Sequence, residues 1–176
     1  MMRSRLFAIA SLAVAFAVGF AGAPWAQQQQ ESATPEEVVD KAKQAAQHLA
    51  REGEAGLEEF RSTDSEYVWK DSYVVVQDCE EGKAVAHPIS PELEGVDLRT
   101  LEDENGKAFA QELCERAQEP GGGWVEYMWP KQGEQEPSRK VAYALSVEGT
   151  PYVVVSGVYD EDATVEELEK ISGGQP

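Results

Sequence analysis

The hydrophobic residues change their spacing along the chain, and each spacing predicts a different element. Between residues 38 and 49 they recur every three or four positions, which is typical of a helix with one buried face. Thr34 is a candidate N-cap, Pro35 occupies the first helical position, and Glu37 follows three residues after the cap. These signals predict a helix from residue 35 to about residue 51, with a further short helical turn at 57–60.

From residue 73 onwards the hydrophobic period shortens to two, which predicts strands. We expect five of them, at 73–76, 83–86, 124–129, 139–147 and 152–159. Two more amphipathic segments predict helices at 107–118 and 165–171, and an irregular loop is expected at 90–100. Because short turns join most consecutive strands, the sheet should be antiparallel and the fold class α+β.

Large aromatic residues are concentrated in one predicted strand, within the stretch GGGWVEYMWP at 121–130. Strand side chains alternate between the two faces of a sheet, so Trp124 should lie on one face and Tyr127 and Trp129 on the other. Both faces are therefore expected to be covered. We predict that Trp124 belongs to the core, whereas Tyr127 and Trp129 face either a pocket or a second part of the core. The strand itself is expected beside the centre of the sheet.

The net charge of the chain excludes some classes of binding partner. It contains 33 acidic and 15 basic residues among 176, a net charge of −18. A binder of the nucleic-acid backbone is excluded, because such proteins present patches of lysine and arginine. The acidity also argues against adhesion to an anionic membrane. We interpret it as a solvated surface that resists aggregation, with binding of a cationic partner as the alternative.

The first 26 residues have the pattern of a secretory signal peptide. Two arginines precede an uncharged apolar segment at 6–23, and small residues follow. Cleavage is expected after Ala26, with Ala23 as the alternative site. An uncleaved anchor is the competing interpretation, since a segment of this length just spans a bilayer. After cleavage we expect a polar tether at 27–33, no stable membrane span, and a periplasmic or secreted location.

Export also bears on Cys79 and Cys114, the only two cysteines. In an oxidising compartment a disulfide between them is the default expectation. Two separate buried thiols are the alternative, because the sequence does not give the distance between them. There is no CxxC motif, so a redox-catalytic role is not expected.

Motifs for catalysis, metals and cofactors are absent from the sequence. No nucleophile motif is present, and His48 and His87 have no metal-ligand spacing. His48 is expected on the surface of the first helix. The segment 103–106 lacks the remaining positions of a calcium loop and is expected to be a plain turn. We therefore expect neither an enzyme nor a metal or cofactor site.

Several short motifs follow one another in a specific order: DSYVVV (71–76), AHP (86–88), GVDL (95–98), DENGK (103–107), Phe109, GWVEYMWP (123–130), KVAY (140–143) and SGVY (156–159). Together they resemble a single Cache domain, the extracytoplasmic sensor module of bacterial chemoreceptors and histidine kinases. The resemblance implies a PAS-like fold over 34–160, in which a long N-terminal helix and a second helix pack on a central antiparallel sheet of about five strands. A short C-terminal helix and tail would occupy 161–176.

The resemblance also implies a small-molecule pocket on one face of the sheet, roofed by loops and a helix, of the kind that often holds short carboxylates or amino acids. Such a pocket needs an apolar wall, a cation and a few hydroxyl groups. The candidate ligand-binding residues supply these groups: Tyr127, Trp129, Lys140, Tyr143, Tyr159 and His87. The family pattern favours Lys140 over its neighbour Arg139 as the inward-facing cation. The alternatives are that the aromatic residues form core and that Lys140 is a solvated charge on an edge strand.

These observations predict a sensor domain that binds a small organic ligand outside the cytoplasm. Because the chain has no second transmembrane segment and no kinase or methyl-accepting region, we expect it to act through a partner such as a membrane receptor or kinase. The alternative is an interaction protein of the same fold that has lost ligand binding and uses its acidic surface for a cationic partner.

Overall fold

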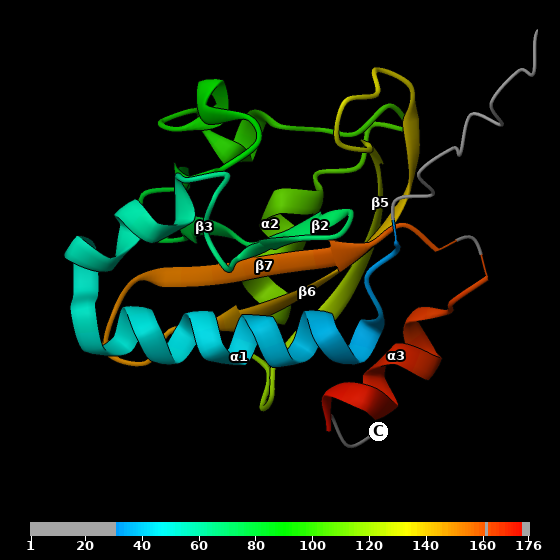
Figure 1. Ribbon diagram of the computed structural model, residues 1–176. Coiled ribbons are helices and arrows are strands. Elements are labelled where there is room, and N and C mark those ends of the chain that lie inside the picture. The colour runs from blue at the N-terminus through cyan, green and yellow to red at the C-terminus, as the bar shows by residue number, and fades with distance from the viewer. Residues whose placement is uncertain (1–30, 161, 174–176) are drawn as a thin grey trace, which may run out of the picture.

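A computed structural model describes residues 31–160 and 162–173, so the predicted signal peptide and most of the tether lie outside the described residues. Its long elements are α1 (Pro35–Glu52), β3 (Val75–Asp78), β4 (Lys83–Ala86), α2 (Phe109–Arg116), β5 (Gly123–Pro130), β6 (Pro137–Ser146), β7 (Tyr152–Val158) and α3 (Val165–Ser172). A central antiparallel sheet carries α1 along one face and α2 on the other (Figure 1). The predicted α+β, PAS-like architecture is confirmed.

The start of α1 follows from its sequence. The side chain of Thr34 accepts a hydrogen bond from the Glu37 amide, and the Glu37 carboxylate accepts one from the Thr34 amide at 2.9 Å. This reciprocal pair satisfies amides that the first helical turn leaves without partners. The helix ends at Glu52, where Gly53 adopts a positive φ of 58°. The predicted turn at 57–60 forms part of a 3-10 helix, η1 (Gly53–Phe60).

The strand order β4-β3-β7-β6-β5 corrects one prediction. The aromatic strand β5 lies at the edge of the sheet, whereas β7 occupies the centre. The reason is composition, because β7 is rich in valine and buried along nearly its whole length, as a central strand must be. At the outer edge of β5, the carboxylate of Asp103 accepts a hydrogen bond from the Met128 amide, and Lys107 donates one to the Glu126 carbonyl. These side chains form hydrogen bonds with backbone groups of β5 that could otherwise pair with a strand of another chain.

Several local elements were not predicted. A two-stranded hairpin forms from β1 (Val68–Trp69) and β2 (Ser72–Tyr73), so the expected strand at 73–76 is divided at Val74. The expected irregular loop contains two 3-10 turns, η2 (Pro91–Leu93) and η3 (Leu98–Thr100). Elements this short depend on tertiary contacts more than on periodicity.

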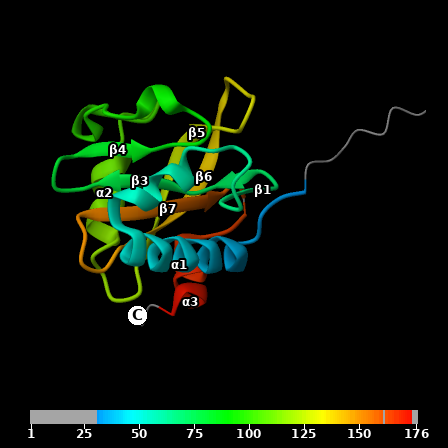
Figure 2. The same ribbon diagram turned by 60° about the vertical axis from the view of Figure 1, so that its left-hand side comes forward.

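The sheet separates two hydrophobic cores. The core on the α1 side contains Trp124 and Tyr143, and the core on the α2 side contains Phe109 and Tyr127. Side views show α1 and α2 on opposite sides of the strands (Figure 2). His48 was expected on the surface, but it is half-buried on the α1 side, with its ring 5.9 Å from that of Phe60.

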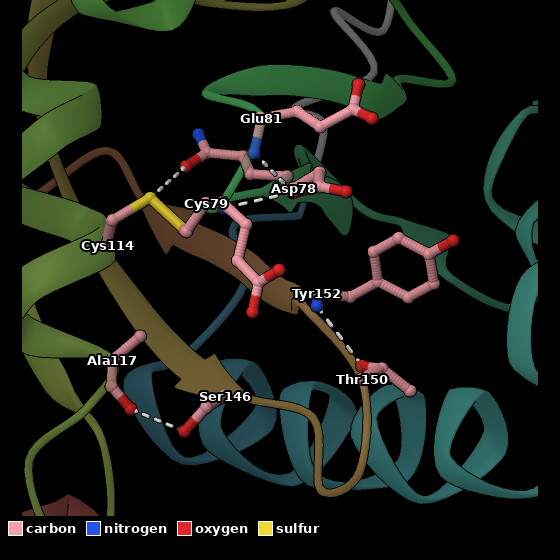
Figure 3. The surroundings of a disulfide bond; sticks show 10 residues. Asp78, Cys79, Glu81, Cys114, Ala117, Ser146, Thr150 and Tyr152 are labelled. Atoms are coloured by element: carbon pink, nitrogen blue, oxygen red, sulfur yellow. Dashed lines mark hydrogen bonds between the residues drawn. A yellow bond between two sulfur atoms is a disulfide. The ribbon is translucent and has the colours of Figure 1, made fainter.

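The disulfide between Cys79 and Cys114 is confirmed, with 5.8 Å between the Cα atoms. Cys79 follows the end of β3, and Cys114 lies on α2 (Figure 3). The bond therefore ties α2 to the part of the sheet opposite β5. Among residues 31–160 and 162–173, no helix combines the length and the apolar character needed to cross a membrane.

Candidate ligand-binding cavity

A small cavity of about 40 Å³ lies on the α2 side of the sheet. The strand residues that line it are Tyr73, Val75, Gln77, Ala84, Tyr127, Trp129, Lys140 and Val155. The roof consists of the segment between β4 and α2, together with the first residue of α2. It contributes His87, Leu93, Leu98, Leu101 and Phe109. Strand and roof therefore enclose the cavity from opposite sides.

Strand periodicity brings the floor residues together. Tyr73, Val75 and Gln77 occupy alternate positions of one extended segment and share a face. Tyr127 of β5 lies directly opposite Lys140 of β6 in the antiparallel register. Because opposite residues in a ladder point to the same face, the aromatic wall and the cation converge on one site.

Lys140 is the buried cation of the site, with only 5% of its surface exposed. Its Nζ atom lies 3.3 Å from the hydroxyl oxygen of Tyr73 and 4.3 Å from the centroid of the same ring. Burial acts to lower the pKa of Lys140, but the surrounding tyrosine hydroxyls and rings raise it above the ordinary lysine value, so the amine is protonated. No carboxylate of the described residues pairs with this ammonium group.

His87 is neutral and presents a donor. Its Nδ1 atom accepts hydrogen bonds from the amides of Ser90 at 2.9 Å and Ile89 at 3.3 Å, which places the ring proton on Nε2. Burial, together with the nearby charge of Lys140, lowers the pKa of His87 to about 3. The Nε2 atom has no hydrogen-bond partner within the described part of the chain, and the residue lines the cavity.

The aromatic rings of the wall pack against one another. The rings of Phe109 and Tyr127 stack 4.1 Å apart at 6°, and Trp129 packs 5.5 Å from Phe109. Tyr127 is buried, which raises the pKa of its hydroxyl group and keeps it protonated. A protonated phenol, a neutral imidazole N–H and an ammonium group therefore surround a space with apolar walls. This combination suits a small anion that carries a short apolar tail.

Comparison with known proteins identifies the family. The family model described as single Cache domain 2 matches residues 18–172. The chain belongs to this family. Members are extracytoplasmic sensor domains that bind ligands, so the fold and the general role predicted from the motifs are confirmed.

Related proteins come from chemotaxis. The chain is 34% identical over 84 residues to the methyl-accepting chemotaxis protein McpP of Pseudomonas putida, a match that covers 48% of this chain and 15% of that receptor. It therefore spans only a small part of that relative. A solved structure described as the periplasmic sensor domain of a chemotaxis protein is 31% identical with a TM-score of 0.58, and covers 72% of this chain and 93% of that chain.

A second solved structure bears on the ligand. It is described as the structural basis for carboxylic acid recognition by a Cache chemosensory domain. It is 29% identical to this Cache domain with a TM-score of 0.56, and covers 70% of this chain and 89% of that chain.

One candidate residue of this Cache domain lies away from the cavity. Tyr143 is on the α1 side of the sheet, where its ring packs 5.2 Å from Trp124 and its hydroxyl donates to the Gly121 carbonyl. Three positions separate it from Lys140 along β6, so strand alternation sends the two side chains to opposite faces. The prediction that Lys140 and Tyr143 face the same pocket was therefore wrong about Tyr143.

The other candidates lie in or beside the cavity. Tyr127, Trp129, Lys140 and His87 line it, whereas Tyr159 lies at its margin with its ring 5.2 Å from the Lys140 ammonium. The Tyr159 hydroxyl donates to the Pro130 carbonyl at 2.6 Å. Their role in binding a ligand stays a prediction.

Two important residues of the site were missed. Tyr73 holds the Lys140 ammonium, and Phe109 stacks on the wall. Tyr73 could have been found, because it alternates with Val75 in a segment that was already predicted to be a strand. Phe109 could not, since the sequence does not tell which face of the sheet α2 covers.

The cavity adjoins an outer hollow of about 440 Å³ between the β5–β6 turn and the roof. Tyr73, Leu93 and Trp129 line both spaces. The two spaces therefore meet at these three side chains.

Proposed function

We propose that this Cache domain senses a short aliphatic monocarboxylate, and that Lys140 binds the carboxylate group. The observation that carries the proposal is a buried ammonium group that faces a cavity and has no anionic partner among the described residues. A buried charge is costly unless an opposite charge and hydrogen bonds compensate it. A ligand carboxylate would supply that charge.

Two further donors support binding of a carboxylate. The Nε2–H of His87 and the hydroxyl of Tyr127 belong to residues that line the same cavity as Lys140. A carboxylate accepts several hydrogen bonds on its two oxygens, and bonds to a charged donor are the strongest of these. Three donors of this kind would hold the ligand without any metal.

The walls and the size of the cavity favour a short, uncharged tail. Val75, Val155 and Phe109 supply apolar surface beyond the polar groups. The cavity is small, with a volume of about 40 Å³. Acids of the size of acetate and propionate fit this description better than longer chains.

The lining also discriminates between carboxylates and amino acids. An amino acid carries an ammonium group, which a binding site normally meets with a carboxylate. No aspartate or glutamate is among the described residues that line the cavity. Amino acids are therefore disfavoured. The recognition of carboxylic acids by a structurally similar Cache domain supports the same choice.

Calorimetric titration of the purified chain with acetate, propionate and alanine at equal concentrations tests the proposal. We expect saturable binding of propionate and none of alanine, because only the amino acid brings an uncompensated ammonium group. Tighter binding of alanine than of propionate, or no binding of either acetate or propionate, would contradict it.

We further propose that the domain works in the periplasm and passes its state to a receptor or kinase. The relative in Pseudomonas putida is a chemotaxis receptor in which the matched region is a small part of the whole protein. Crosslinking in the native membrane, followed by identification of the attached protein, tests this proposal. If the same proteins are crosslinked to the same extent with and without propionate, the result would count against a signalling role.

A further inference from the structure

We propose that the Cys79–Cys114 disulfide is a thiol-exchange site that controls closure of the ligand cavity. The bond joins the two ends of the segment that carries the cavity roof, from the end of β3 to α2 (Figure 3). Every roof residue of the cavity, from His87 to Phe109, lies between these two cysteines. The part of the proposal that concerns ligand affinity rests on the proposed carboxylate site.

The disulfide supplies the covalent connection between α2 and the end of β3. Helix α2 packs mainly on β5, β6 and η3. In the sheet order β4-β3-β7-β6-β5, the disulfide ties the same helix to β3, beyond the central strand. Without it, α2 would keep its contacts with one half of the sheet and lose its covalent attachment to the other half.

The bond also borders the cavity. The Oε1 atom of Gln77, which lines the cavity, lies 3.7 Å from Sγ of Cys114. Leu98 of the roof lines both the cavity and a second hollow, which lies beside the disulfide. A displacement of Cys114 would therefore reach the lining of the cavity through Gln77.

The two cysteines are open to reagents in solution. Both are half-buried, and both line the hollow beside the disulfide, which has a volume of about 330 Å³. A thiolate needs access to a sulfur atom along the direction of attack, and this hollow provides space for a small dithiol. Disulfides in closed cores lack such access.

The exchange is an ordinary two-electron step. A thiolate of the dithiol attacks one cysteine sulfur, forming a mixed disulfide and releasing the other cysteine as a thiolate. The second thiolate of the reagent then displaces the first cysteine. The protein gains two electrons and two protons and carries two thiols, while the dithiol is oxidised to its cyclic disulfide.

Dithiothreitol is the probe, and hydrogen exchange is the main measurement. We expect reduction to raise the exchange rates of amides in 88–108 about tenfold or more, while amides at the centres of β6 and β7 keep their protection. If the closed roof is then populated about one-tenth of the time, the apparent Kd for propionate rises about tenfold. The Cys79→Ser/Cys114→Ser variant should have the exchange rates and the propionate Kd of the dithiothreitol-treated protein, and dithiothreitol should change neither.

The outcomes separate this proposal from the carboxylate proposal. Unchanged exchange in 88–108 after complete reduction would overturn it, since the bond would then be a simple staple. Loss of protection throughout the sheet would also overturn it, because the bond would then stabilise the whole fold rather than the roof. If the oxidised chain binds no carboxylate, the proposed ligand fails, and the exchange rates still decide whether the roof is under thiol control.

Discussion

The two faces of one sheet do different work in this Cache domain. On the α1 side, Trp124 and Tyr143 are fully buried in a core that fills the space between helix and strands. On the α2 side, the same strands carry Lys140 and Tyr127 beside a cavity. The first face is a filled core, and the second places polar groups around a cavity. Substitutions should therefore affect stability and binding separately, depending on the face.

The largest expected effect tests the packed face. Trp124→Ala should lower the free energy of unfolding by about 3–5 kcal/mol, because it removes a large side chain from a filled core. Urea unfolding measures this loss. The matched change on the other face, Trp129→Ala, removes a half-buried ring and should cost clearly less stability while altering propionate affinity. Equal losses of stability would contradict the division between the faces.

The next effect tests the cavity face. Lys140→Met should reduce propionate affinity at least about 100-fold, equivalent to roughly 2.7 kcal/mol, because it removes the only buried cation proposed to meet the carboxylate. Stability should stay the same or rise, since a buried charge without an anionic partner is replaced by an apolar side chain. Calorimetry and urea unfolding of one preparation measure both quantities. Lys83→Met, on an exposed position of β4, is the control and should change neither.

A third prediction concerns pH. The pKa of His87 is about 3 in the folded domain and roughly 6.5 in an unfolded chain. Below pH 6.5 the unfolded chain therefore binds more protons, so stability is lost as the pH falls from 6.5 towards 3. At pH 5 the loss should reach about 2 kcal/mol relative to pH 7.

Comparison with His87→Asn isolates this contribution, because the asparagine oxygen can still accept the backbone amide protons. We expect its unfolding free energy to change little between pH 7 and pH 5. The carboxyl groups of Asp103 and Glu126, whose pKa values hydrogen bonds lower in the folded state, affect stability mainly at lower pH. If the unfolding free energy of His87→Asn depends on pH as strongly as that of the wild type, protonation of His87 does not cause the loss of stability.

The smallest effects compare two tyrosine hydroxyls. Tyr143→Phe removes the hydrogen bond to the Gly121 carbonyl and should cost about 0.5–1.5 kcal/mol of stability without changing propionate affinity. Tyr127→Phe removes a hydroxyl from the cavity and should weaken propionate binding severalfold with little change in stability. A weaker ligand affinity of Tyr143→Phe would restore this residue to the binding site.

Local chemistry in the sequence was sufficient for much of the fold. The capping box at Thr34 and Glu37 specified where α1 begins, because its groups are three residues apart and need no tertiary partner. Strand alternation correctly separated Trp124 from Tyr127 and Trp129, since the period of two is a property of the backbone. The same rule, applied consistently to β6, would have excluded Tyr143 from the cavity.

Only the tertiary structure decided the strand order and the composition of the site. The last strand, β7, inserts between β3 and β6 and thereby moves the aromatic strand to the edge. That arrangement brings Tyr73 to Lys140 across 67 positions of the chain, and Phe109 of α2 onto Tyr127. Sequence periodicity is local and fixes which way a side chain points. The choice of neighbours depends on how all the elements bury their apolar faces together, and no short stretch of sequence contains that information.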